Sequence, residues 1–126
     1  MQWVVDYLPE SAVVRVTTEG PMTLEDNLAF INDALAVSKV HGAIRFLVDH
    51  RKMIPALKIE ELFDLPVINA RMGVDPNMCV AVVYSPDSPG RDDFFFYDAR
   101  TRGKGIRNIR MFTDMEHALD WLITGD

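Results

Sequence analysis

The chain has 126 residues, 48% hydrophobic and 25% charged, which is enough for one globular domain with a single core. Thirteen basic against nineteen acidic side chains give a formal net charge of −6, which argues against general binding to nucleic acid or anionic membranes. The single cysteine excludes an intrachain disulfide, and no apolar run approaches the roughly 20 residues that span a bilayer. We therefore expect one domain over residues 1–126, located in the cytoplasm and without a membrane span.

The first third of the chain predicts a β-hairpin followed by a helix. The runs at 2–8 and 12–20 are rich in β-branched residues, and the Pro-Glu-Ser segment at 9–11 favours a turn between them. Apolar residues then recur at helical spacing over 24–40. An approximate capping box at 23–26 marks the start of this helix.

The middle of the chain predicts a buried strand, a short helix and a second buried strand. The strand at 43–49 is almost continuously apolar and does not alternate with polar residues, as expected when helices cover both faces of a sheet. Residues 58–65 have the apolar spacing of a short helix, which is expected to be interrupted before Pro66. This proline could stand at the first position of a further helical turn. The continuous apolar run at 78–84 has the length of a strand, and a strong loop signal follows at 85–90.

The last third predicts a helix at 92–102, a strand at 106–112 and a final helix that begins with a Thr113/Glu116 capping box. The complete order is β-β-α-β-α-β-α-β-α. Alternating strands and helices favour a parallel sheet covered by helices. The sequence therefore predicts an α/β fold, with a five-stranded, mostly parallel sheet, an N-terminal antiparallel hairpin strand and about four helices.

Short stretches spread over nearly the whole chain carry the core pattern of a known family of domains. These stretches are Gly20 with Thr23, FLVD at 46–49, VAVV at 80–83, Gly103, IRMF at 109–112 and ALDWL at 118–122. With this element order, the chain resembles the STAS-like (SpoIIAA-like) stand-alone domains of bacteria, and more distantly the small core of the Sec14 lipid-transfer fold. The resemblance implies the fold and a tendency toward protein–protein recognition.

The resemblance also points to a difference from the anti-sigma-factor antagonists. Those proteins carry an Asp-Ser pair at the start of the helix after the third strand, and a partner kinase phosphorylates the serine. The corresponding stretch here, KMIPALKIE at 52–60, contains neither serine nor threonine. Since a phosphoryl switch of this kind needs a hydroxyl, the resemblance implies a non-enzymatic regulatory or interaction module that lacks the phosphorylatable serine.

Polar residues follow the strands at 43–49 and 78–84. Asp49, His50 and Arg51 lie at the end of the first, where ligands bind in open α/β sheets. Loops at the same edge supply further polar residues that could line a shallow polar cleft together with Asp49 and His50: Thr18, Glu19, Ser85, Asp87 and Ser88. Alternatively, Asp49 caps the loop or pairs with a neighbouring arginine, while His50 and Arg51 are solvated. Ser85 with His50 and Asp49 is the only nucleophilic grouping that the topology permits, but Ser85 is more simply part of a turn.

No metal or cofactor site is expected, because the three histidines are dispersed and no ligand motif occurs. The segment 100–110 concentrates five positive charges on an acidic protein. Arg100 and Arg102 could bind an anion or an acidic partner, or they could complement the C-terminal end of their helix. Aromatic residues are not interleaved with these charges, so we do not expect nucleic acid as a partner.

The aromatic run at 94–97 cannot hide on one face of a helix. Phe94 and Tyr97 share one side and Phe95 lies on another, so one set packs on the sheet while the other is exposed or contacts a partner. An exposed apolar patch would favour a homodimer, the commonest oligomer.

Three functions follow as hypotheses. The first is a non-enzymatic module for protein–protein recognition or small-ligand sensing. The second is a small apolar-ligand or lipid binder of Sec14-like type, with an enclosed cavity near Ile54, Phe63, Phe94 and Phe95. The third, kept as a residual, is an enzyme that uses His50.

Overall fold

Five strands and four helices alternate along the chain in the predicted order, and the computed structural model describes residues 1–125. The strands form one sheet of order β1-β2-β3-β4-β5, in which β1 is antiparallel to β2 and all other neighbours are parallel. The predicted fold class is therefore confirmed. The elements are β1 (Gln2–Leu8), β2 (Val13–Met22), α1 (Leu24–His41), β3 (Arg45–Pro55), α2 (Ile59–Arg71), β4 (Cys79–Val83), α3 (Arg91–Gly103), β5 (Ile109–Phe112) and α4 (Met115–Thr124).

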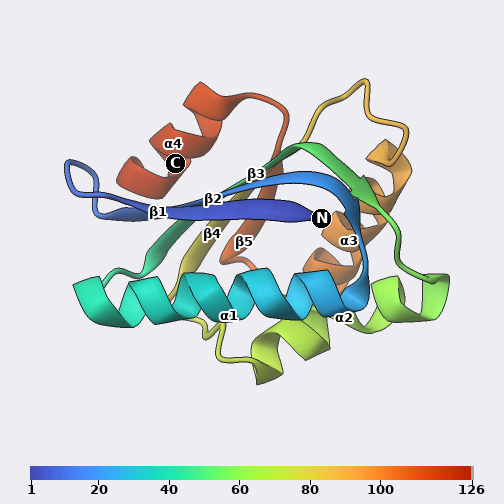
Figure 1. Ribbon diagram of the computed structural model, residues 1–126, viewed down its shortest axis with the longest axis horizontal. Helices are drawn as coiled ribbons and strands as arrows, with labels where there is room; N and C mark the ends of the chain where they lie inside the picture. Colours follow the sequence, from blue (N-terminus) through green and yellow to red (C-terminus); the bar gives the residue numbers. More distant parts are fainter. Residues whose placement is uncertain (126) are drawn as a thin grey trace.

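Helices cover both faces of the sheet, with α4 on one side and α1, α2 and α3 on the other (Figure 1). Alternate residues of the central strands therefore enter different cores. Val48 packs in the core beneath α1, whereas its neighbour Leu47 packs with Trp121 of α4. This double coverage explains why the apolar residues of β3 and β4 run almost without interruption.

Strand β3 is longer than the sequence predicted. It was expected to end at residue 49, but it continues to Pro55 because β2 also continues and pairs with it as far as Met22. The chain therefore does not leave the sheet at Asp49, although β3 pairs with β4 only up to that residue, opposite Val83. The expected end of the strand at residue 49 is correct for the pairing of β3 with β4 and wrong for its pairing with β2.

Helix α2 runs through Pro66, where the sequence predicted a pause. Proline removes one main-chain hydrogen bond from a helix, but it does not by itself stop a helix that gains enough from packing. Leu62 and Leu65 of α2 are buried together with Tyr97 of α3, and Pro66 is fully buried beside them. Tertiary packing therefore outweighs the local signal.

The two predicted capping boxes have different outcomes. The Thr23 hydroxyl accepts a hydrogen bond from the main-chain N–H of Asp26 at 3.3 Å, as expected. The main-chain N–H of Thr23 in turn donates to the Asp26 carboxylate at 3.0 Å. At α4 the cap is Asp114, whose carboxylate accepts from the Glu116 nitrogen at 2.9 Å. The expected Thr113 cap is wrong by one residue, because an aspartate next to it serves as well.

Candidate functional site

The aromatic run on α3 divides between the core and the surface. Phe94 and Tyr97 are 6% and 7% exposed, whereas Phe95 is 70% exposed. Phe94 stacks on Tyr84 with 4.8 Å between ring centroids. The predicted separation of the run is confirmed, and the inward set forms one wall of a pocket.

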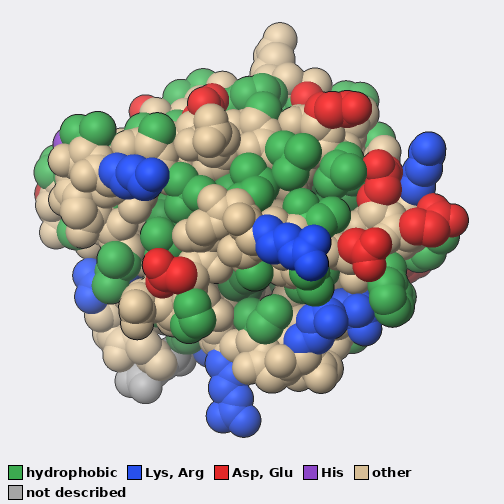
Figure 2. Space-filling model, turned by 90° about the horizontal axis from the view of Figure 1, so that it is seen from below, with side chains coloured by type: hydrophobic (Ala, Val, Ile, Leu, Met, Phe, Trp, Pro, Cys, Tyr) green, Lys and Arg blue, Asp and Glu red, His purple; other side chains and the backbone are tan. Residues whose placement is uncertain are grey.

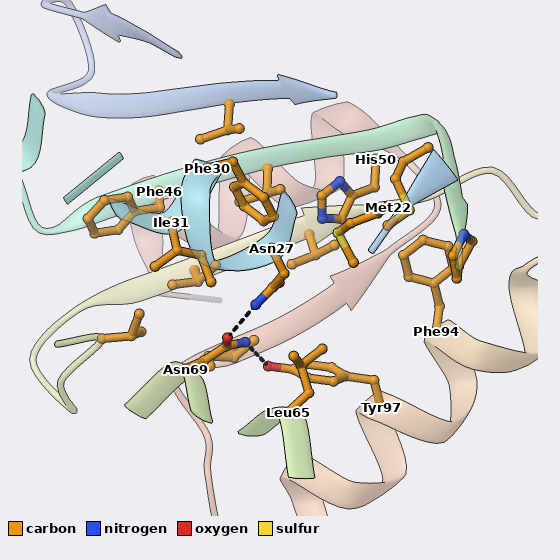
Figure 3. Close-up of a pocket in the computed structure, with 18 of the residues that line it drawn as sticks. Met22, Asn27, Phe30, Ile31, Phe46, His50, Leu65, Asn69, Phe94 and Tyr97 are labelled. Atoms are coloured by element: carbon orange, nitrogen blue, oxygen red, sulfur yellow. Dashed lines mark hydrogen bonds between the residues drawn. The ribbon is translucent and has the colours of Figure 1, made fainter. Parts of the chain in front are cut away.

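This pocket, of about 110 Å³, lies between α1, α2, α3 and the sheet (Figure 3). Its walls are largely apolar and contain no lysine or arginine. Apolar pockets with a few convergent polar groups are the usual form of small-ligand sites. Prominent apolar lining residues are Phe30, Ile31, Ala34, Phe46, Leu65 and Phe94.

The pocket differs from the expected cavity in its lining residues. Of the four residues expected around it, only Phe94 lines it. Ile54, Phe63 and Phe95 are exposed at the surface by 46%, 48% and 70%. Phe63 lies on the outer side of α2, where the Arg100 guanidinium covers its ring at 3.7 Å from the centroid. The apolar spacing of a helix identifies its faces, but it does not tell which face meets the sheet.

A chain of hydrogen bonds crosses one side of the pocket. Asn27 of α1 donates to the Asn69 side-chain oxygen at 3.0 Å, and Asn69 of α2 donates to the Tyr97 hydroxyl of α3 at 3.1 Å (Figure 3). All three side chains are buried. Burial raises the pKa of Tyr97 to about 12, against a smaller opposite effect of the Asn69 bond, so the phenol stays protonated.

The sequence analysis missed Asn27 and Asn69. A signal was present for Asn27, since it shares one helical face with Phe30 and Ala34, two other buried residues of α1. A polar residue on an apolar face is either paired or functional. The partner could not be found, because it lies 42 residues away along the chain.

His50 is the second polar feature of the pocket, and it is only 6% exposed. Its Nδ1 lies 2.7 Å from the Thr18 hydroxyl oxygen, and this hydroxyl donates to the Asp49 carbonyl at 3.2 Å. Burial lowers the pKa of His50 to about 4, although the charge of Asp49 acts in the opposite direction. The expectation that His50 is solvated is therefore wrong, and its ring is neutral near pH 7.

His50 faces the pocket through the ordinary alternation of β3, on the same side as Phe46 and Val48. A β-bulge follows it: between Thr17 and Glu19 of β2, the register with β3 moves from Asp49 to Lys52, so that β3 has one extra residue. The bulge allows Met53, three residues after His50, to face the same pocket, with the two residues between them exposed. Bulges change the direction of side chains in this way and are frequent beside functional sites.

Asp49 and Arg51 form an ion pair outside the pocket. The Arg51 guanidinium donates to both carboxylate oxygens, at 2.9 and 2.8 Å. Burial would raise the pKa of Asp49, but the hydrogen bonds and charge of Arg51 outweigh it, and the pKa is lowered. The alternative in which Asp49 pairs with a neighbouring arginine describes this arrangement, and the Arg51 side chain is half exposed.

Ser85 and Asp87 form a turn after β4. The Ser85 hydroxyl accepts from the Asp87 nitrogen at 3.2 Å, and neither residue lines the pocket. The structure thus brings His50 together with Phe94 and Tyr97, and leaves Ser85 and Asp87 outside this group. Thr18, the hydroxyl next to His50, is 1% exposed and is not a lining residue, so it cannot act on a bound molecule.

Arg100 and Arg102 lie in the last turn of α3, where cations complement the partial negative charge of a helix. Arg102 also pairs with Asp98 one turn earlier, at 3.1 Å. Together with Arg107 and Arg110, Arg102 lines a shallow surface depression near β5.

Within residues 1–125 no cluster of three metal-ligating side chains occurs, and none of the helices there is both long and apolar enough to cross a membrane.

The sheet order, the antiparallel first strand and the placement of the helices define the SpoIIAA-like α/β fold. Three solved structures share it. The unphosphorylated anti-sigma factor antagonist SpoIIAA matches with a TM-score of 0.53 at 9% identity, covering 92% of each chain. The phosphorylated Bacillus cell fate determinant SpoIIAA gives 0.54 at 12%, covering 94% of this chain and 97% of that one.

The third structure is an uncharacterised DUF3478-family protein with a SpoIIAA-like fold from Shewanella loihica. It gives a TM-score of 0.56 at 19% identity, covering 96% of this chain and 92% of that one. No family model matches the sequence, and no curated protein matches it significantly. At these identities the similarity establishes the fold, and the role must be argued from the site.

Proposed function

We propose that the protein is a non-enzymatic binding module that takes up a small, mostly apolar molecule in the pocket between α1, α2, α3 and the sheet. The observation that supports this proposal is the pocket itself, about 110 Å³ with apolar walls and two groups of buried polar side chains. Three methionines, Met22, Met53 and Met111, line it and give it adaptable walls.

An unfilled pocket of this size is unfavourable in so small a domain. At ~24 cal/mol per Å³ for a closed, empty cavity, the upper limit of this loss is about 3 kcal/mol in the free energy of unfolding, and the true loss is smaller because the pocket is partly open. A domain typically has roughly 5–15 kcal/mol in all. Larger side chains at a few positions would remove this loss. The retention of the space is explained if a ligand fills it and restores the missing contacts.

The arrangement around His50 supports binding rather than catalysis. A nucleophile must have its proton taken by the base, and it must reach the substrate. The Thr18 hydroxyl instead donates its proton to a main-chain carbonyl and lies outside the pocket. His50 therefore lines the pocket and is held by Thr18, without a nucleophile to activate.

A matched pair of substitutions on α1 tests this function. Ala34 lines the pocket, whereas Ala36 on the same helix is exposed. Ala34→Leu fills the space, so we expect binding of toluene, measured by titration calorimetry, to weaken at least ~tenfold while the melting temperature stays equal or rises. Ala36→Leu should leave both unchanged. Toluene binding that is absent from the unsubstituted protein, or equally strong in Ala34→Leu, would refute the proposal.

A second candidate function is protein–protein recognition, which includes self-association. Ile59, Phe63 and Val67 lie at four-residue spacing on α2 and are 62%, 48% and 37% exposed, so they form an apolar stripe on its outer side. The face that carries α1 and α2 has hydrophobic side chains gathered over its middle, with charged side chains among and around them (Figure 2). The segment 52–60 that leads into α2 contains no hydroxyl, so recognition at this face would not be controlled by phosphorylation there.

A further inference from the structure

One nitrogen of the buried His50 ring is free to bind a ligand. Nδ1 contacts Thr18, and within residues 1–125 Nε2 has no hydrogen-bond partner, although His50 as a whole is only 6% exposed. Figure 3 shows the ring beside Phe30 and Met22, among the side chains that line the pocket. Buried polar atoms are nearly always paired, so an unpaired one that faces a pocket marks a contact point for a ligand.

The hydrogen bonds around Thr18 determine which ring nitrogen carries the proton. A threonine hydroxyl has one proton, and Thr18 donates it to the Asp49 carbonyl at 3.2 Å. Both contacts of the Thr18 hydroxyl are satisfied together only if the same oxygen, 2.7 Å from Nδ1, accepts a hydrogen bond from the ring. In that tautomer Nε2 presents a lone pair and accepts, because a neutral imidazole has only one N–H.

We propose that the pocket recognises an uncharged, one-ring-sized molecule that carries a hydroxyl or similar donor, and that this group donates a hydrogen bond to Nε2 of His50. This inference rests on the proposed binding function and specifies its ligand. A purely apolar molecule of the same size would leave Nε2 unpaired, so the protein discriminates in favour of a donor.

Size and charge narrow the class further. The pocket of about 110 Å³ is somewhat smaller than the roughly 150 Å³ cavity in an engineered lysozyme that binds benzene. This favours a ligand of about six or seven non-hydrogen atoms, the size of one ring with a small substituent. An anion is disfavoured, since the walls offer no lysine or arginine and Asp93 lies among them.

Tyr97 and the Asp93 carboxylate are the competing polar contacts in the pocket, and Tyr97 is the one whose hydrogen bonds are defined. Its oxygen accepts from Asn69, so its own O–H can donate to a ligand acceptor. A ligand hydroxyl could meet either group. The two contacts require opposite roles of the ligand, because Nε2 of His50 accepts a hydrogen bond from it and the Tyr97 hydroxyl donates one to it.

Phenol and toluene separate these possibilities, since they have nearly the same shape and differ by a hydroxyl in place of a methyl group. The ratio of their dissociation constants, measured by titration calorimetry near neutral pH, reports recognition of the hydroxyl. We expect His50→Leu to lower the preference for phenol at least ~tenfold while toluene still binds. Tyr97→Phe should leave this ratio within about twofold of the unsubstituted protein.

Each other result has a defined meaning. If both ligands bind and His50→Leu leaves the ratio unchanged, or if only Tyr97→Phe changes it, the inference is overturned and the binding function stands. If neither ligand binds the unsubstituted protein, both fail. Toluene binding also shows that His50→Leu is folded.

A direct measurement does not depend on any substitution. In the unsubstituted protein, ¹⁵N NMR of the His50 ring should show a protonated Nδ1 and an unprotonated Nε2. Phenol should shift the Nε2 resonance in the direction of an accepted hydrogen bond, and toluene should not. A protonated Nε2 in the free protein would overturn the inference.

Discussion

The burial of His50 is a property of one residue that follows from the alternation of β3. Phe46, Val48 and His50 lie two residues apart and line the same pocket, so the strand pattern contains the inward position. The sequence analysis ended the strand at residue 49, whereas β3 continues to Pro55, and His50 was therefore expected to be solvated. The strand alone could not predict the inward direction of Met53, since this depends on one extra residue in the pairing of β3 with β2.

The burial of His50 should make the stability of the protein depend on pH. Its pKa is about 4 in the folded protein against 6.5 for an exposed histidine, so in acid the unfolded chain binds a proton that the folded protein does not. The protonation of His50 therefore has almost no effect on the free energy of unfolding above pH 6.5, and it lowers that free energy as the pH falls from 6.5 toward 4. From about pH 7 to about pH 5, urea denaturation should show a loss of roughly 2 kcal/mol.

The His50→Leu variant is the control for this prediction. It retains the carboxyls nearest the ring, Asp49 on β3 and Asp93 on α3, so their titration cancels in the comparison. The variant should lose markedly less stability over the same interval. Equal losses in both proteins would show that His50 is not the group responsible.

At the scale of elements, long and strongly periodic segments were predictable and the contacts between elements were not. The spacing of α1 gave its start and its capping box. By contrast, the passage of α2 through Pro66 depends on packing against α3. The same limit applies to Asn69, whose partners Asn27 and Tyr97 come from two other helices. The pocket is therefore a feature of helix placement, which one-dimensional patterns do not contain.

The position of α3 over the pocket depends on a close approach at the N-cap that precedes its first residue. Gly90, the N-cap of α3, lies against the Pro55 ring at the end of β3, and a Cβ on Gly90 would overlap the Cδ atom of that ring. Gly90→Ala should therefore lower the free energy of unfolding by about 1–3 kcal/mol and weaken toluene binding, because Pro55 and Phe94 both line the pocket.

The other end of the same helix provides the matched control. A Cβ on Gly103 would meet no atom within 4 Å. Gly103→Ala should leave toluene binding unchanged and raise the stability by up to about 1 kcal/mol, because alanine is the better helix former. Chemical denaturation and calorimetry of the two variants check both expectations. A Gly90→Ala protein as stable as the unsubstituted one would show that α3 moves freely relative to β3.

At the scale of the whole molecule, the two sides of the sheet have different packing. The side beneath α4 is closed by Trp121, Leu122 and Phe112, which form a continuous cluster. The side beneath α1, α2 and α3 contains the pocket. Both sides of the sheet thus carry an apolar core, and the side where three helices share the surface of the sheet is the one that leaves space.

The apolar stripe on α2 leads to the last prediction, which concerns association. If Ile59, Phe63 and Val67 form the contact between two copies, native mass spectrometry at micromolar concentration should show a dimer, and Phe63→Glu should convert it to a monomer. The variant should fold, because the Arg100 guanidinium that now covers the Phe63 ring can pair with the new carboxylate. Val40→Glu, at an 80% exposed position near the end of α1, should leave the dimer intact. A monomer at all concentrations would exclude self-association and leave the stripe for another partner.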